Sequence, residues 1–145
     1  MPSKTTHTAH NCVQSLFDTL IDISEGYTLL IERAEPSIRA FIRDLADQHT
    51  RDISVIDAQA SAHGFELDRS GTVMSEVHKA AVKLRDLFSD LDRTALEAVA
   101  EGEENVVKRY DDAIKCLSPD DTLHTTLVEQ RSALRSKIAD IFEAV

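Results

Sequence analysis

The chain has 145 residues, which is enough for one domain with a sizeable core. It contains only 4 glycines and 3 prolines, and this scarcity of turn residues favours an all-α fold over a sheet. Sixteen Lys and Arg against 26 Asp and Glu give a net charge of −10, so we expect neither nucleic acid nor an anionic membrane surface as a partner.

Targeting and redox signals are few. The first ten residues, "MPSKTTHTAH", lack the apolar stretch of a signal peptide, and no apolar run approaches the ~20 residues of a membrane-spanning helix. Cys12 and Cys116 are isolated and show neither metal-type spacing nor a disulfide framework. The sequence therefore predicts a cytoplasmic protein with two reduced thiols.

The polar residues 1–10 predict a flexible leader, which leaves 11–145 as a single domain. A first helix is predicted over 11–35, where Asn11 and Gln14 resemble a capping box. Its apolar residues recur with a 3.6-residue period. They are Val13, Leu16, Phe17, Leu20, Ile23, Tyr27, Leu30 and Ile31.

Further helices are predicted along the rest of the chain. Pro36 is suited to be the first residue of a helix over 36–62, because a helix leaves its first N–H groups unpaired and proline has none. A shorter helix is predicted over 72–89 and a long one over 92–117.

The stretch "SPDD" predicts the start of the last helix, with Ser118 as its N-cap and Pro119 in its first turn. The turns at 35–36 and 117–119 are tight, so each should join an antiparallel helical hairpin. The connection between the hairpins contains the helix over 72–89. At ~1.5 Å per residue it could carry the chain most of the way back along the bundle.

This layout predicts a ferritin-like four-helix bundle, in which two antiparallel hairpins are joined by a crossover that contains a short fifth helix. The alternative is an up-and-down bundle with the fifth helix packed outside.

Five polar residues interrupt the apolar stripes of the four long helices. Each is within about one turn of its helix midpoint. In antiparallel hairpins the midpoints lie at the same height, so we expect these side chains to form one layer, here called the polar belt. Its members are Ser24, His49, Asp52, Glu103 and Gln130.

One interpretation of the polar belt is a site for a divalent ion (Fe, Mn or Zn). His49 and Asp52 are three residues apart on one helix face, and Glu103 would approach from another helix. Ferritin-like di-metal centres use Glu-x-x-His pairs, and this sequence contains none. The residues that could complete the shell are Glu25, His78 and Glu104.

The other interpretation is a buried hydrogen-bonded network that fixes helix register. Glu103 and His49 would form an ion pair, unless Arg131 or Lys137 neutralises the acids instead. The remaining polar groups would be satisfied by Ser24, Tyr27 and Gln130.

Four stretches of the sequence follow one another in the same order as in a known family pattern. They are "DISEGY", "LADQHTRDISVI", "EVHKAAVKLRDLF" and "EGEENVVKRYDDAI". Their most specific points are Asp22, Gly26 and Tyr27, the His-Lys at 78–79 and the Gly-Glu at 102–103. The pattern resembles a bacterial family of ferritin-like helical-bundle domains of unknown function, over about residues 11–143. The resemblance implies the crossover topology and favours metal binding and His78, whereas the missing Glu-x-x-His pairs argue against ferroxidase or oxygenase activity.

Two functions stay open at this point. The first is a non-enzymatic structural or interaction protein, associated with stress, that forms a homo-oligomer such as a dimer or docks an unknown protein partner. The second is a protein that sequesters or senses a divalent ion. The sequence has no Gly-rich phosphate loop and no Gly-x-Ser-x-Gly elbow, so we assign no catalytic residue and lean against an enzyme.

Overall fold

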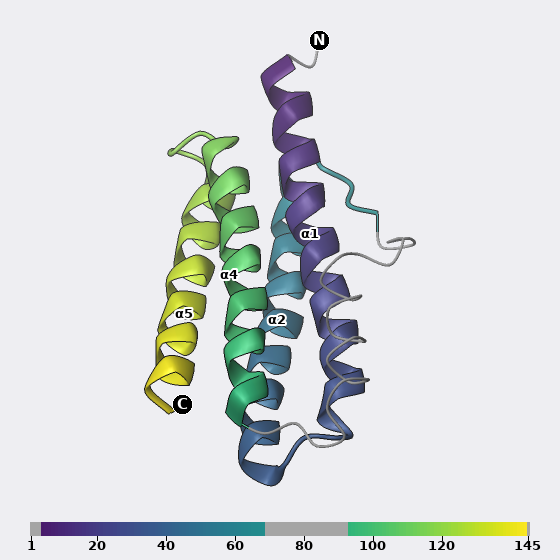
Figure 1. Cartoon of the computed structure of the whole chain (residues 1–145). Coiled ribbons are helices and arrows are strands. Elements are labelled where there is room, and N and C mark those ends of the chain that lie inside the picture. The colour runs from purple at the N-terminus through teal and green to yellow at the C-terminus, as the bar shows by residue number, and fades with distance from the viewer. Residues whose placement is uncertain (1–3, 69–92, 145) are drawn as a thin grey trace.

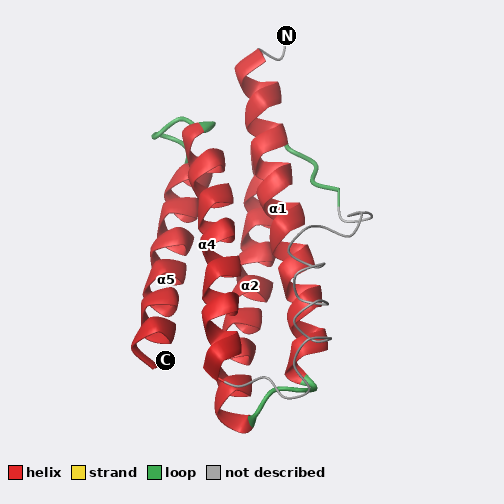
Figure 2. Ribbon diagram, viewed as in Figure 1, coloured by secondary structure: helices red, strands yellow, loops and turns green. Residues whose placement is uncertain are grey.

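The computed structural model describes residues 4–68 and 93–144, which form a bundle of four long helices (Figure 1). These are α1 (Lys4–Ile31), α2 (Pro36–His63), α4 (Arg93–Lys115) and α5 (Thr122–Ala144). All regular structure in these two ranges is helical, as predicted (Figure 2). None of these helices combines the length and apolar character needed to span a bilayer.

Each helix packs against two neighbours: α1 and α5 both contact α2 and α4. The colour gradient in Figure 1 shows that every neighbouring pair is antiparallel. The diagonal helices α2 and α4 are therefore parallel, a relation that the sequence left open. The chain leaves α2 at one end of the bundle and enters α4 at the other. The fifth helix predicted over 72–89 lies outside the described residues.

The ends of α2 follow the sequence signals closely. Pro36 is the first residue of the helix, as predicted. At the other end Gly64 has a φ of 95°, a left-handed conformation that glycine adopts without strain. The N–H of Gly64 then bonds the carbonyl of Ser61 and the N–H of Phe65 bonds that of Ala60, which is the Schellman ending.

The N-terminal helix begins earlier than predicted. α1 begins at Lys4, so the N-cap predicted at Asn11 is wrong and residues 4–10, expected in a flexible leader, are helical. The apolar stripe extends one turn further than the capping box suggested, because Ala9 is buried while Asn11 is exposed. Burial of this extra turn outweighs the local capping signal.

The last helix begins later than predicted. Asp121, rather than Ser118, is the residue before the first turn of α5, and its Oδ1 accepts a hydrogen bond from the N–H of Leu123 at 3.0 Å. An aspartate is as good an N-cap as a serine, so the "SPDD" stretch contains two competing start signals. The second one is used.

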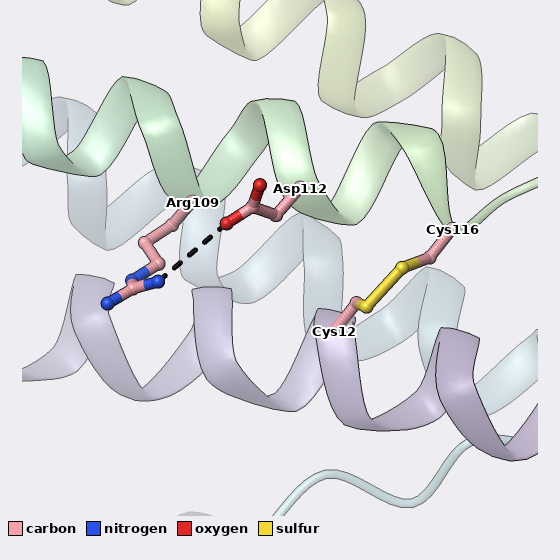
Figure 3. The surroundings of a disulfide bond; sticks show 4 residues. All are labelled: Cys12, Arg109, Asp112 and Cys116. Atoms are coloured by element: carbon pink, nitrogen blue, oxygen red, sulfur yellow. Dashed lines mark ion pairs between the residues drawn. A yellow bond between two sulfur atoms is a disulfide. The ribbon is translucent and has the colours of Figure 1, made fainter.

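A disulfide bond joins Cys12 to Cys116, so the prediction of two reduced thiols is wrong for this structure (Figure 3). The two residues are 104 positions apart in sequence, and their Cα atoms are 6.6 Å apart, within the usual range for a disulfide. The antiparallel packing of α1 against α4 places them at the same height. Their pairing is thus a consequence of topology and not of spacing.

Candidate functional site

The centre of the bundle is occupied by a charged pair from two diagonal helices. His49 of α2 and Glu103 of α4 are both fully buried. The Nε2 atom of His49 lies 2.9 Å from Oε1 and 2.8 Å from Oε2 of Glu103, so one N–H is shared by both carboxylate oxygens. The His49–Glu103 contact expected in the second of the two interpretations is therefore present, and it connects helices that are not direct neighbours in the bundle.

Opposing effects set the protonation of this pair. Burial lowers the pKa of the His49 imidazole, but the charge and hydrogen bond of Glu103 raise it, with a further rise from the charge of Asp52. Lys137 of α5 acts in the opposite direction. The net effect is a pKa above the usual 6.5, which favours the imidazolium that Glu103 needs as a partner.

Three buried polar atoms of α1 and of His49 have no hydrogen-bond partner among the described residues. They are the Ser24 hydroxyl, the Tyr27 hydroxyl and Nδ1 of His49. The Tyr27 ring stacks on the His49 ring with centroids 6.2 Å apart. Burial first, and then the nearby Glu103 carboxylate, raise the pKa of Tyr27, although its hydroxyl does not reach hydrogen-bond geometry with that carboxylate.

The other half of the polar belt is built around Asp52. The Tyr110 hydroxyl lies 3.1 Å from Oε1 of Gln130 and 3.5 Å from Oδ2 of Asp52, and it donates between them. The Nε2 of Gln48 donates to the other oxygen of Asp52 at 2.9 Å. Burial raises the pKa of Asp52, while the Gln48 and Tyr110 hydrogen bonds and the charge of His49 oppose that rise.

The predicted metal ligands are thus only partly brought together. His49 and Glu103 meet, but the side chain of Asp52 is bonded to Gln48 and Tyr110. Within the described ranges, no three or more His, Cys, Asp or Glu side chains are grouped as a metal would require. Glu25 and Glu104 are exposed, and His78 lies outside the described residues.

The flanking cations do not neutralise the acids of the polar belt. Arg131 pairs with Asp111 at 2.7 Å, and Lys137 pairs with Asp44. Both ion pairs lie at the partly exposed rim of the bundle. The charge that balances Glu103 therefore comes from His49.

One member of this site was missed from the sequence. Tyr110 is not among the five residues of the predicted polar belt, yet it is fully buried and its hydroxyl joins Asp52 to Gln130. A usable signal existed, because Tyr110 comes seven residues after Glu103 and so falls on the same face two turns along. A buried phenol needs a partner, which pointed to the neighbouring polar positions.

Comparison with known proteins identifies a family but no activity. Residues 8–116 match the family model described as Domain of unknown function (DUF2383). No curated protein and no solved structure matches the chain. Because the matched region covers most of the chain, the protein belongs to the DUF2383 family.

Proposed function

We propose that this protein is a non-enzymatic, ferritin-like helical bundle with a structural or interaction role, in which the polar belt fixes the register of the helices. The observation that supports this proposal is the buried ion pair between Nε2 of His49 and the carboxylate of Glu103. Both oxygens of the carboxylate are engaged by one imidazole N–H in a fully buried setting. Each charge is balanced inside the bundle.

The pair favours one register because its alternatives are costly. A slip of one helix by a turn of about 5.4 Å would separate Glu103 from His49, and in one direction it would bring the Glu103 carboxylate level with Asp52, which carries a like charge. Removing one partner of a buried ion pair costs about 3–5 kcal/mol, and a slip would separate both charges. Buried polar positions fix register in coiled coils by the same physics.

The helix connectivity supports the ferritin-like part of the proposal. The helices α2 and α4 are parallel, and each is antiparallel to both of its neighbours. The connection between the two hairpins must therefore run from one end of the bundle to the other. A single long crossover of this kind is the connectivity of ferritin-like bundles. The functional surface would then be an outer face. The net charge of −10 suits a basic protein partner better than an acidic one.

The experiment is a double-mutant cycle measured by urea unfolding. Glu103→Leu and His49→Leu should each cost about 3–5 kcal/mol, because each leaves a buried charge without its partner. The double variant should lose much less than the sum of the two, since a well-packed apolar pair replaces the ion pair. Glu104→Leu, at the exposed neighbouring position, is the control and should change stability by about 0.5 kcal/mol or less. Additive losses in the double variant would contradict the proposal.

A second candidate function is the binding of a divalent ion, and the orphaned polar atoms favour it. An imidazole nitrogen and carboxylate oxygens 2.8–2.9 Å apart could share a metal ion in place of a proton. The unpartnered Tyr27 hydroxyl next to them would add an oxygen donor. His49, Glu103 and Tyr27 would then hold Fe, Mn or Zn, and binding would weaken as pH falls because the ligands must lose protons.

Elemental analysis of protein purified without an affinity tag or chelator, before and after loading with each metal, tests this second function. Near-stoichiometric metal that disappears in Glu103→Gln, with a metal-dependent rise in melting temperature, would support it and contradict the closed ion pair. Unchanged metal content and melting temperature after loading would refute it and leave the register function standing.

A further inference from the structure

The disulfide bond lies at one end of the bundle, between the first half of α1 and the end of α4 (Figure 3). Cys12 and Cys116 are the only cysteines of the chain, and both side chains are half-buried. Both residues pack against the edge of the core rather than inside it. An attacking thiolate must reach one of the two sulfurs to open a disulfide, and a bond at the edge of the core is closer to solvent than one inside it.

On its other side, the same part of α1 is held by the segment that follows α2. The Gln14 side-chain amide donates to the backbone carbonyl of Asp68 at 3.0 Å and accepts from its N–H at 2.8 Å. His10 bonds the carbonyl of Glu66 at 2.9 Å, and its ring stacks on Phe65. These bonds are exposed and individually weak. The disulfide is the one covalent restraint on this part of α1.

Apolar contacts would keep the helices folded if the disulfide were opened. Val13, next to Cys12, and Ala113, one turn before Cys116, are fully buried in the common core. Leu16 and Leu117 continue this packing on either side. Opening the disulfide would thus loosen one end of the bundle without removing the forces that hold its middle.

We propose that Cys12–Cys116 is a reversible dithiol–disulfide site, opened by dithiol reductants, that controls how firmly the first turns of α1 are held against the end of α4. In the reduction, a reductant thiolate attacks one cysteine sulfur, the S–S bond breaks and the other cysteine leaves as a thiolate that takes up a proton. The second thiol of the reductant then attacks the mixed disulfide. Two free cysteine thiols and one reductant disulfide result, so two electrons and two protons are transferred.

A responsive disulfide and a permanent one differ in whether reduction requires the protein to unfold. A half-buried disulfide between two helices that remain packed without it can be opened and closed in the folded protein. A permanent bond would instead resist reduction until the bundle unfolds.

The first measurement is thiol labelling of the full chain under native conditions. Oxidised protein is treated with increasing concentrations of dithiothreitol and labelled with a maleimide, both without denaturant, and the mass of the product is measured by mass spectrometry. We expect two labels per chain after reduction. In a separate sample, reduced and unlabelled protein should return to the oxidised mass when a low-molecular-weight disulfide such as oxidised glutathione is added. Labelling that appears only after denaturant is added would overturn the proposal, and so would protein that stays fully reduced under the oxidant.

The second measurement is hydrogen exchange of the oxidised and reduced forms. Among amides that exchange by local opening, those of α1 around Cys12 and of α4 before Cys116 should exchange roughly tenfold faster or more after reduction, while those of α5 should be unchanged. Amides that exchange only by global unfolding should accelerate in all four helices, because the whole domain becomes less stable. The Cys12→Ser, Cys116→Ser double variant should match the reduced form and should not respond to dithiothreitol. Equal exchange in both forms, or the same acceleration of locally opening amides in all four helices, would show that the bond does not control this end of the bundle.

Discussion

Breaking the disulfide should lower the stability of the whole domain by an amount that follows from its place in the chain. The bond closes a loop of about 104 residues. In the chain-entropy model, such a loop restricts the unfolded chain by about 4.7 kcal/mol at 25 °C. For 145 residues the entropy of unfolding is about 300 cal/mol/K near the melting temperature, so the loss corresponds to a fall of about 15 °C.

The assay is thermal unfolding followed by circular dichroism at 222 nm, for oxidised protein, reduced protein and the Cys12→Ser, Cys116→Ser double variant. The reduced form and the double variant should melt together, well below the oxidised form, and reductant should leave the double variant unchanged. If the oxidised and reduced forms melt within about 3 °C of each other, the loop-closure reasoning is refuted for this protein. The stabilisation that comes from restricting the unfolded chain would then be cancelled by an unfavourable effect of the bond on the folded protein.

Two further predictions concern the polar belt. The pKa of His49 is raised in the folded protein, so the stability that its charged form contributes is complete below about pH 6.5 and is lost as pH rises through the folded pKa. Urea unfolding between pH 6 and 9 should show this fall in stability, and the His49→Leu, Glu103→Leu double variant should lack it. Tyr110→Phe removes the hydroxyl between Asp52 and Gln130, and calorimetry should show a loss of about 1–3 kcal/mol, whereas an unchanged melting temperature would mean that the hydroxyl contributes little.

The helical stripes predicted most of the fold and the centre of the site. Apolar positions at a 3.6-residue period located the four helices, and a polar residue on a buried stripe is visible without a structure because it breaks the period. Matching the helix midpoints then placed His49 opposite Glu103, and the structure confirms their contact. The position of Asp52 could not be resolved in this way, because height along the bundle does not specify which neighbour a carboxylate faces.

Other features depend on competition or on long-range geometry. The stretch 118–121 offers two N-caps of similar strength, and the packing of α5 decides between them. The Cys12–Cys116 bond requires both the direction of α4 and its height against α1, and neither can be obtained from the spacing of two cysteines. Tyrosine counts as a hydrophobic residue in the periodicity of a helix, so that pattern alone gives no sign that the Tyr110 hydroxyl belongs to the polar belt.

The helix α4 and the residue directly after it provide one partner of the ion pair with α2 and one partner of the disulfide with α1. Glu103 lies inside α4 and Cys116 directly follows its last residue, and no loop separates them. One residue inserted between these positions would rotate one against the other by about 100° and shift it by about 1.5 Å along the axis. Such a change could not preserve both the ion pair with α2 and the disulfide with α1. Changes of length should therefore be tolerated in the turns at 32–35 and 118–121, and not between 103 and 116.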